Sequence, residues 1–383
     1  MTIDDVCFVS TWDVSCGIAK YTAALRGALD DSGVATSVLT IDRQQLGRLA
    51  RRELASYFDD LGREAAGHRV VHVQHEFGFF AGSYGHPESV ANLRRFLKAA
   101  RRGAERVVVT FHSLPPVPFW PHRTLAGVAR EQFLAQVWRV AVAKLLRGDG
   151  VRVVAPSRYQ RRLLIDSGVD PSVISLISQG APTFSHRRTR AGARAALGID
   201  EEAKVVVLFG FVAAHKGHLV AINALRALPA SYHLVVVGGP HPHNNDPTYE
   251  KVLSALRRRP ALRPRVHVTG WVEDDEVADW FAASDVAIAP YIDSRLVTSA
   301  AAVWALASGR PLIASDLPVF RELVDDWDCA ELVAPDAPNR LAETIQRIVD
   351  DDERSKELVE NAAEAATAWA WPRVAEEHVQ IYR

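Results

Sequence analysis

Several residues able to do chemistry directly follow short apolar segments of the chain. Residues 70–74 (Val-Val-His-Val-Gln) lead into His75 and Glu76, and residues 106–111 lead into His112. A histidine or a carboxylate at the end of a buried strand can move a proton or hold a hydroxyl group. His112 could equally be a satisfied structural histidine. Glu76 could be a base on the acceptor side or the structural partner of a nearby arginine.

A second set of residues could bind a phosphate. Gly210 ends an apolar segment at residues 205–210, and the loop that follows it holds His215 and Lys216 before Gly217. A lysine ammonium in such a loop can make charge-assisted hydrogen bonds to phosphate oxygens. We therefore expect Lys216 to be a phosphate ligand, with a solvated surface lysine as the alternative.

The stretch at residues 294–316 organises the second half of the chain. Thr298 and Ser299 are favourable N-cap residues, the alanine-rich run behind them has high helix propensity, and Gly309 ends the helix. The backbone N–H groups at its start would lie at the carboxyl end of a strand predicted for residues 286–290. Anions bind at such places in α/β proteins. The alternative is an ordinary capped helix in an α/β core.

The segment after Glu76, at residues 77–87, is rich in glycine and aromatic residues. Its glycines allow movement, and Phe79, Phe80 and Tyr84 offer ring faces to a sugar. Segments of this kind often form binding loops.

Strand-like segments alternate with helical periods along the chain, which predicts parallel sheets. The predicted strands are residues 6–10, 34–41, 70–74, 106–111 and 151–155, and then 205–210, 233–239, 266–270, 286–290 and 312–314. A stretch without a strong period, from Gly180 to Arg194, separates the two sets. We predict an α/β chain of two doubly wound domains, at residues 1–180 and 181–366, facing a central cleft. An amphipathic helix follows at residues 367–383.

The composition is typical of a globular protein, with 48% hydrophobic and 24% charged residues in a chain of 383. No apolar run approaches the roughly 20 residues of a membrane span, and the first residues have no signal-like apolar core. Cys7, Cys16 and Cys329 are too few and too scattered for a disulfide framework or a zinc site. We expect a cytoplasmic protein without a metal.

The net charge of −1 conceals an asymmetry between the two halves. Residues 1–180 carry 23 Lys and Arg against 17 Asp and Glu, whereas the remaining residues carry 22 against 29. A basic first half would suit an anionic acceptor or peripheral contact with a membrane surface, but ordinary solvated surface has the same bias more often. The excess is too small to indicate a nucleic acid as partner. Nothing in the sequence indicates the oligomeric state.

In their order along the chain, these segments resemble the retaining GT-B glycosyltransferases of family 4. The resemblance rests on Gly17 after the first strand, residues 109–112 (Val-Thr-Phe-His), residues 155–157 (Ala-Pro-Ser), Gly210 with Lys216 and Gly217, residues 237–239 (Val-Gly-Gly) and residues 305–311 (Ala-Leu-Ala-Ser-Gly-Arg-Pro). Residues 371–382 also resemble that family's last helix, which crosses back onto the N-terminal domain. Together these segments cover nearly the whole chain.

The resemblance implies two Rossmann-like domains and an enzyme that transfers a hexose from a nucleotide diphosphate sugar. The acceptor would be a hydroxyl of a glycan or a small molecule, and neither a metal nor another cofactor is implied. His112 would contact the transferred sugar, and the loop at residues 77–87, with Phe79, Phe80 and Tyr84, would face and bind the acceptor. The residues implied at the donor are Gly17, Gly210, Lys216, Val272, Thr298, Ser299 and Ala300.

The chain departs from the family's pattern at the donor. Members usually carry two glutamates eight positions apart, one at the sugar and one at the ribose, and here these positions hold Leu296 and Trp304. An arginine normally follows the glycine of the phosphate loop, and here that residue is Phe211. Arg295 is the best local substitute for this cation, and His215 the second. Two other interpretations stay open: a nucleotide-sugar epimerase on the same scaffold, and a catalytically inactive binding or scaffold subunit.

Overall fold

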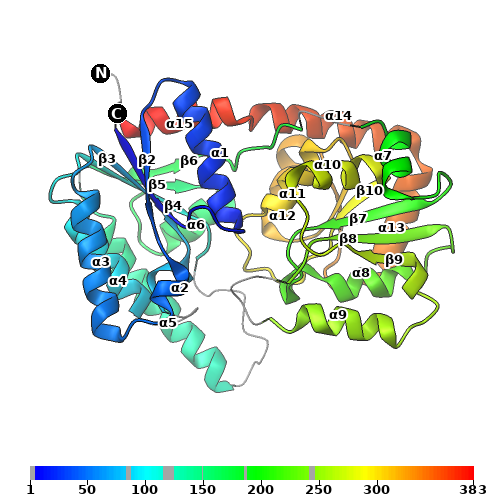
Figure 1. Cartoon of the computed structure of the whole chain (residues 1–383), viewed down its shortest axis with the longest axis horizontal. Coiled ribbons are helices and arrows are strands. Elements are labelled where there is room, and N and C mark those ends of the chain that lie inside the picture. The colour runs from blue at the N-terminus through cyan, green and yellow to red at the C-terminus, as the bar shows by residue number, and fades with distance from the viewer. Residues whose placement is uncertain (1–4, 83–87, 115–124, 149, 185–187, 241–245) are drawn as a thin grey trace. The chain divides into compact units, whose positions relative to one another are not determined.

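The computed structural model describes the whole chain except residues 1–4, 83–87, 115–124, 149, 185–187 and 241–245. The described residues form two α/β units, each built on a parallel sheet of six strands (Figure 1). Unit 1 comprises Met1–Gly180, Arg295–Thr298 and Trp371–Arg383, and unit 2 comprises Ala181–Ser294 and Ser299–Ala370. The prediction of two doubly wound α/β domains is confirmed.

The sheet of unit 1 has the strand order β2-β1-β3-β4-β5-β6. Its strands are β1 (Val6–Ser10), β2 (Thr36–Thr40), β3 (Val70–His75), β4 (Arg106–Phe111), β5 (Val151–Ala155) and β6 (Ile174–Leu176). Every residue of β3 is buried, as expected for a valine-rich strand whose two faces are both covered by helices. The register pairs His75 with Phe111. The polar residues that follow β3 and β4 are therefore neighbours at one edge of the sheet.

Seven helices of unit 1 lie in the described part of the chain. They are α1 (Gly17–Asp31), α2 (Arg43–Leu46), α3 (Arg51–Ala65), α4 (Glu88–Ala100), α5 (Leu125–Leu145), α6 (Arg158–Asp166) and α15 (Trp371–Tyr382). Leu25 of α1 and Val374 and Ala375 of α15 share one buried cluster with strand residues of the sheet. The C-terminal helix therefore completes the core of unit 1, as the resemblance implied, although it begins later than the predicted residue 367.

The sheet of unit 2 has the strand order β12-β11-β10-β7-β8-β9. Its strands are β7 (Lys204–Phe209), β8 (Tyr232–Val237), β9 (Val266–Val268), β10 (Val286–Ala289), β11 (Leu312–Ser315) and β12 (Glu331–Val333). Its helices are α7 (Arg190–Leu197), α8 (His218–Leu225), α9 (Thr248–Arg257), α10 (Asp274–Ala283), α11 (Ala300–Ala307), α12 (Pro318–Trp327), α13 (Pro338–Asp350) and α14 (Asp352–Ala368). Strands β7 and β10 are neighbours, so the residues that follow them meet at one sheet edge.

One short segment, Arg295–Thr298, belongs to unit 1 although the residues on either side of it belong to unit 2. Val297 is buried in the core of unit 1, and the Ser157 hydroxyl donates a hydrogen bond to its carbonyl oxygen at 2.8 Å. The Thr298 hydroxyl donates to Gln179 Oε1, also at 2.8 Å. The predicted domain at residues 181–366 was wrong to include this segment, because Val297 is an apolar residue that fills the other core.

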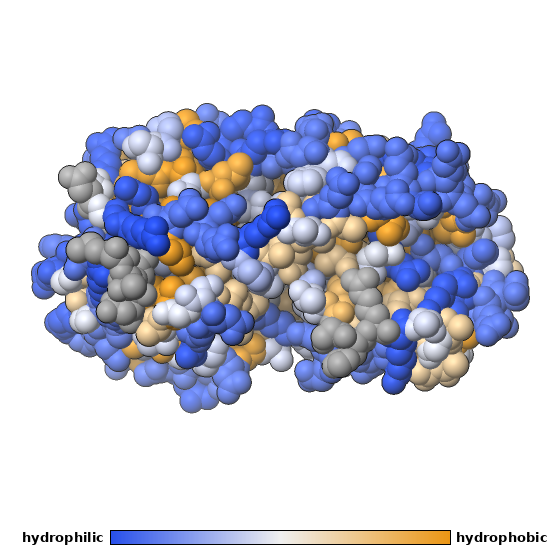
Figure 2. All heavy atoms as spheres, turned by 90° about the horizontal axis from the view of Figure 1, so that it is seen from above, coloured by the Kyte–Doolittle hydropathy of each residue, from blue (hydrophilic) through white to orange (hydrophobic). Residues whose placement is uncertain are grey.

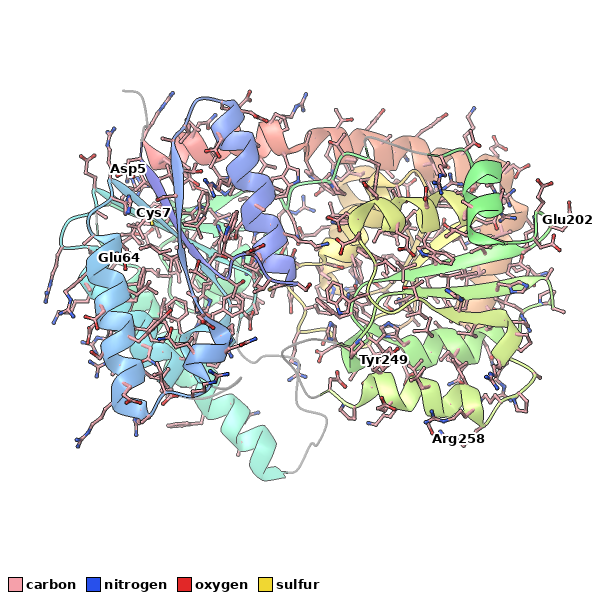
Figure 3. The ribbon with its side chains drawn as sticks, in the orientation of Figure 1. Asp5, Cys7, Glu64, Glu202, Tyr249 and Arg258 are labelled. Carbon is pink, nitrogen blue, oxygen red and sulfur yellow. The ribbon has the colours of Figure 1, made fainter. Side chains whose placement is uncertain are left out.

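The thiols of Cys7 and Cys329 are buried and inert. Burial raises the pKa of Cys7 to about 11, and the carboxylates of Asp5 and Glu64, labelled in Figure 3, act in the same direction. Burial likewise raises the pKa of Cys329 to about 12. Because the thiolate is the nucleophilic form, neither cysteine is reactive at neutral pH.

Hydrophilic residues cover much of the face shown in Figure 2, and apolar residues appear between them in patches. Among the residues that the structure describes, no helix combines the length and the apolarity needed to span a lipid bilayer.

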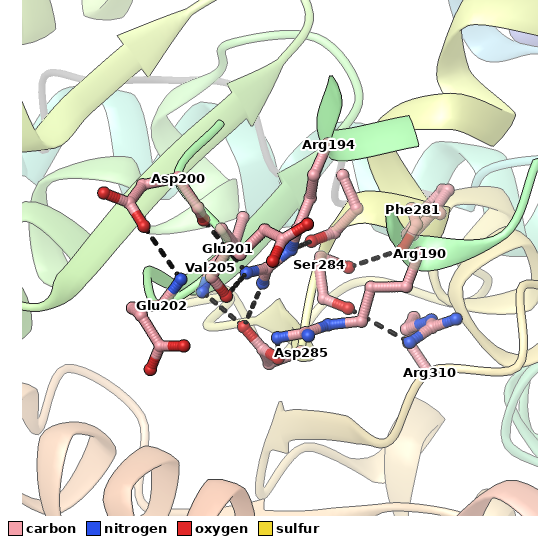
Figure 4. A network of polar contacts seen from close by, with 11 residues as sticks. Arg190, Arg194, Asp200, Glu201, Glu202, Val205, Phe281, Ser284, Asp285 and Arg310 are labelled. Carbon is pink, nitrogen blue, oxygen red and sulfur yellow. Dashed lines mark hydrogen bonds and ion pairs between the residues drawn. The ribbon is translucent and has the colours of Figure 1, made fainter. Parts of the chain in front are cut away.

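A buried arginine, Arg194, joins α7 to the sheet of unit 2 (Figure 4). Its Nε donates to the carbonyl oxygen of Ala283 at 2.9 Å, and its Nη1 donates to those of Asp200 and Glu201 at 3.1 and 2.6 Å. Its Nη2 is 2.9 Å from a carboxylate oxygen of Asp285. A single side chain thus connects the end of α7 with the segments that lead into β7 and β10.

Replacing Arg194 with methionine is expected to destabilise unit 2 by about 2–3 kcal/mol, because several buried acceptors lose a charged donor. The carboxylate of Asp285 would not be left unpaired in this variant, since it keeps Arg190 and the backbone N–H of Val205 as partners. The destabilisation is therefore smaller than for an isolated buried charge. Urea unfolding measures the change. Arg190→Met is the control, because that side chain is 41% exposed and its ion pair should contribute no more than about 1 kcal/mol. Equal losses in the two variants would contradict the role given to Arg194.

Candidate functional site

Lys216 and the start of α11 come together in unit 2. Lys216 ends the short 3-10 helix Ala214–Lys216, and its Nζ lies where a side chain on Gly210 would have to be. The same ammonium is 5.7 Å from the ring centroid of Tyr291. A β-carbon on Gly210 would also lie 3.6 Å from that of Ala301, in the first turn of α11. The absence of a side chain at Gly210 therefore makes room for a cation beside a helix start.

The start of α11 adds hydrogen-bond donors to this cation. Ser299 is the N-cap, and its hydroxyl accepts from the N–H of Ala302 at 3.2 Å and lies 3.2 Å from the Tyr291 hydroxyl. The N–H groups of Ala300 and the residue after it have no partner within the helix, as at any helix start. These donors, the positive end of the helix dipole and Lys216 form an arrangement that can bind a phosphate.

The loop that carries Lys216 is held against the segment that follows β10. Gly217 has φ +70° and ψ 27°, in the left-handed region, and a β-carbon on it would overlap the carbonyl oxygen of Pro290. The N–H of Ile292 donates to the carbonyl oxygen of His215 at 2.8 Å. Two backbone contacts therefore fix the loop on either side of the lysine.

Trp304, at one position where the resemblance expects a glutamate, belongs to an aromatic cluster. Its ring centroid is 5.2 Å from that of Phe209 and 5.6 Å from that of Phe184, and Phe209 in turn contacts Phe281 at 5.6 Å. An indole in such a cluster packs against apolar groups and provides no carboxylate for a ribose.

A second aromatic pair lies next to Val272, the residue expected near the base. The rings of Phe211 and Trp271 meet edge to face with centroids 4.8 Å apart, and Trp271 is 45% exposed. An exposed indole offers a stacking face to a planar base. Phe211 thus supports Trp271, whereas family members usually have an arginine at this position.

In unit 1, His112 lies at the end of β4 and contacts Gln74 of β3. Nε2 of His112 is 2.8 Å from Oε1 of Gln74, and the backbone N–H of His112 donates to the carbonyl oxygen of His75 at 2.9 Å. The ring of Tyr21 meets the imidazole edge to face at 5.0 Å. Burial lowers the pKa of His112 to about 3. The ring is therefore neutral at pH 7, where it can hold a hydroxyl group but does not act as an imidazolium acid.

Glu76 stabilises the turn that follows β3. It is buried and forms the N-cap of the 3-10 helix η1 (Phe77–Phe80), where its Oε1 accepts from the N–H of Gly78 at 3.3 Å. Burial raises the pKa of Glu76, and a hydrogen bond with Ser113 acts against that rise. The carboxyl group holds the turn after β3, and its role as a base toward an acceptor stays a prediction.

The prediction that Phe79 and Phe80 offer ring faces to an acceptor is wrong. Both side chains lie in the core of unit 1, and Phe80 stacks on His75 with centroids 5.5 Å apart. Arg43 donates to the carbonyl oxygens of Gly78 and Ala81, and this guanidinium fixes the turn facing inward. The third predicted acceptor residue, Tyr84, lies outside the described residues.

Helix α1 begins at Gly17 with an open N-terminus. Cys16 before it makes no capping side-chain hydrogen bond, and a β-carbon on Gly17 would meet no described atom within 4 Å. The first N–H groups of α1 are therefore available to an anion, which is compatible with the predicted role of Gly17.

The predicted site residues divide between the two units. Gly210, His215, Lys216, Val272, Ser299 and Ala300 belong to unit 2, whereas Gly17, Glu76, His112, Arg295 and Thr298 belong to unit 1. The structure therefore brings Lys216 together with the start of α11 but not with Arg295 in one unit, and the role of Arg295 as a phosphate ligand stays a prediction.

Sequence reasoning missed Gln74 and Tyr291. A lone glutamine in a valine-rich strand was a usable signal for the first, and nothing distinguished the second from a core aromatic residue.

The sequence is similar to known glycosyltransferases. Residues 203–351 match a family model described as glycosyl transferases group 1. The chain is 30% identical over 214 residues to D-inositol 3-phosphate glycosyltransferase of Xylanimonas cellulosilytica, which covers 56% of this chain and 50% of that protein. It is 31% identical over 140 residues to MMP alpha-(1->4)-mannosyltransferase of Mycolicibacterium hassiacum, which covers 36% and 32%. The alignment with the first of these relatives spans about half of its length.

Solved structures of similar fold extend over nearly the whole chain. Sucrose-phosphate synthase from Thermosynechococcus elongatus has a TM-score of 0.76 at 20% identity and covers 99% of this chain and 98% of its own. HepE of Anabaena in complex with UDP-glucose has a TM-score of 0.72 at 17% identity and covers 98% and 97%. At such identities the likeness shows the fold alone, and it agrees with the two-domain α/β architecture predicted from the sequence.

Proposed function

We propose that this chain, which has the GT-B fold and a glycosyl transferases group 1 domain at residues 203–351, transfers a hexose from a nucleotide diphosphate sugar to an acceptor hydroxyl. The observation that carries the proposal is the pairing of Lys216 with the start of α11 inside the matched residues. A diphosphate leaving group gains negative charge as the glycosidic bond breaks, and a fixed cation beside helix N–H groups stabilises that charge. Since these groups supply positive charge, the transfer needs no divalent metal.

The relatives suggest which donor and acceptor to test first. HepE binds UDP-glucose, so a uridine diphosphate hexose is the first donor to examine. A relative whose name specifies D-inositol 3-phosphate suggests a small phosphorylated acceptor, and the basic excess in residues 1–180 is compatible with such an anion. We propose transfer with retention of the anomeric configuration, in keeping with the family that the chain resembles.

A second candidate, a subunit that binds a nucleotide sugar without transferring it, is favoured by one observation. The position expected to hold a ribose glutamate is Trp304, whose ring packs against Phe209 and Phe184. A site that has lost this carboxylate could retain phosphate binding without turnover. Release of free hexose from the donor, or its transfer to any acceptor, would exclude this candidate.

Lys216→Ala is expected to weaken UDP binding by about 10- to 150-fold, because a charge-assisted contact to phosphate is lost. Calorimetric titration of UDP and UMP into wild type and variant measures the loss, and UDP should lose more than UMP. Lys251→Ala, at an exposed lysine of α9 in the same unit, is the matched control. Unchanged UDP affinity in Lys216→Ala would remove Lys216 from the site. If the wild type binds no nucleoside diphosphate, the proposed function is wrong.

A further inference from the structure

A chain of buried polar side chains in unit 1 connects helix α15 with His112. The Tyr382 hydroxyl is 2.7 Å from Nδ1 of His72, and Nε2 of His72 is 2.8 Å from the Thr110 hydroxyl and 3.3 Å from Nε2 of Gln74. The other end of the Gln74 amide, Oε1, is 2.8 Å from Nε2 of His112. We call His72, Gln74 and Tyr382 the relay. All three side chains are almost fully buried, at 0%, 0% and 3% exposure.

Buried polar groups destabilise the folded state unless they are paired. The hydrogen bonds of the relay therefore hold its side chains in one arrangement. The relay residues also lie on rigid elements. His72 and Gln74 are on β3, and the register places Gln74 beside Thr110 of β4. Movement of Gln74 would therefore break contacts on both sides of it.

The amide of Gln74 determines which nitrogen of His112 carries the proton. An amide oxygen can only accept, so Nε2 of His112 must donate to it. Because the ring is neutral, Nδ1 of His112 is left as a lone-pair acceptor. At the other end, the Gln74 amide nitrogen can only donate, so Nε2 of His72 accepts and Nδ1 of His72 donates to Tyr382.

We propose that Gln74 is a positioning residue that keeps Nδ1 of His112 as the acceptor for a hydroxyl of the transferred sugar, and that His72 and Tyr382 hold Gln74 in that orientation. Among the described residues, no side chain hydrogen-bonds to Nδ1 of His112, and His112 as a whole residue is half-buried, which leaves this nitrogen for a ligand. The inference rests on the proposed function for its substrate, whereas the tautomer it assigns to His112 is a property of the free protein. Helix α15 thereby acts on the sugar site from the last residues of the chain.

The test combines the tautomer of His112 with the kinetics of three variants. Nitrogen-15 NMR of the histidine side chains should show His112 of the wild type protonated on Nε2 alone. Gln74→Met removes the acceptor and should mix the two tautomers and lower kcat about tenfold, the effect of one good hydrogen bond, with an unchanged Kd for UDP. Gln74→Glu keeps an acceptor oxygen and should retain the Nε2–H tautomer and more of the rate. Tyr382→Phe should alter the tautomer of His72 first and that of His112 less.

Gln160→Met is the control, because Gln160 is a fully buried glutamine of the same unit whose amide donates to the carbonyl oxygen of Phe111 instead of contacting His112. It should leave the His112 tautomer and kcat unchanged. The proposal is overturned if wild-type His112 carries its proton on Nδ1, or if Gln74→Met changes neither tautomer nor kcat. Failure of the proposed function would instead show as a wild type that binds no UDP, and the NMR measurement would still decide the tautomer assignment.

Discussion

Replacing Gly217 with alanine is expected to destabilise unit 2 by about 2–5 kcal/mol and to weaken UDP binding. An alanine in the left-handed region costs about 1–2 kcal/mol, and forcing a methyl group into a filled space costs about 1–3 kcal/mol more. Here the methyl group would overlap the carbonyl oxygen of Pro290, a backbone atom that no rotamer change can move away. The loop would have to shift, and Lys216 with it. Urea unfolding and UDP titration measure the two effects.

The chain contains a matched control at Gly198, which ends α7 with nearly the same backbone angles, φ 67° and ψ 33°. A β-carbon on Gly198 would meet no described atom within 4 Å. Gly198→Ala should therefore cost only the backbone part, about 1–2 kcal/mol, and leave UDP binding intact. The difference between the two variants isolates the contact with Pro290. Equal losses in both would show that this contact does not hold the loop.

Acid is expected to unfold unit 1 steeply below pH 6.5. Burial lowers the pKa of His75 and of His112 to about 3, that of His378 to about 4 and that of His72 well below 6.5. The unfolded chain takes up protons at these rings as the pH falls from 6.5 toward 4, whereas the folded chain does not. The stabilisation is therefore complete above pH 6.5 and is lost on acidification. Each such ring contributes up to about 1.4 kcal/mol per pH unit, so the four together contribute up to about 5 kcal/mol per pH unit.

Hydrogen-exchange mass spectrometry at pH 7, 6 and 5 can follow each unit separately. Among the described residues of unit 2, one ring is comparable: burial lowers the pKa of His218 to about 3, so the stability of this unit should fall less steeply. His378→Asn keeps a donor toward the carbonyl oxygen of Val374 and should reduce the pH dependence of unit 1 by about one quarter. His267→Asn, at an exposed histidine, should leave the pH dependence of unit 1 unchanged. A unit 1 whose stability is constant between pH 7 and 5 would contradict the burial argument.

The central strands were predictable because nearly all of their side chains are buried. Residues 6–10, 106–111 and 151–155 are predicted and observed with the same bounds, and each is a run of mostly β-branched or aromatic residues. Strands β6 and β12 were missed. Each has only three residues and lies at the edge of its sheet, where pairing with a neighbour, rather than a pattern in the sequence, decides that a strand forms.

The candidate site was predictable where local chemistry determines it. A lysine between glycines after a strand and a serine before an alanine run are visible in the sequence, and the structure brings both to one place. The inward turn at Phe79 and Phe80 was not visible, because it depends on Arg43, which is more than thirty residues away in sequence. The packing of Val297 in unit 1 was not visible in the sequence either, since an apolar residue in a polar loop does not reveal which core it fills.

Helix α15 has a consequence for how the protein is made. Tyr382, Val374 and Ala375 complete the core around Tyr21 and Leu25 of α1. On the ribosome the residues of α15 are synthesised only after all of unit 2. Domains usually fold in the order of their synthesis. Unit 1, whose first residues are made before unit 2, cannot complete its core until α15 has been made. In a nascent chain paused before Trp371, the apolar face of α1 would be exposed to water. We expect a ribosome-associated chaperone to bind this face.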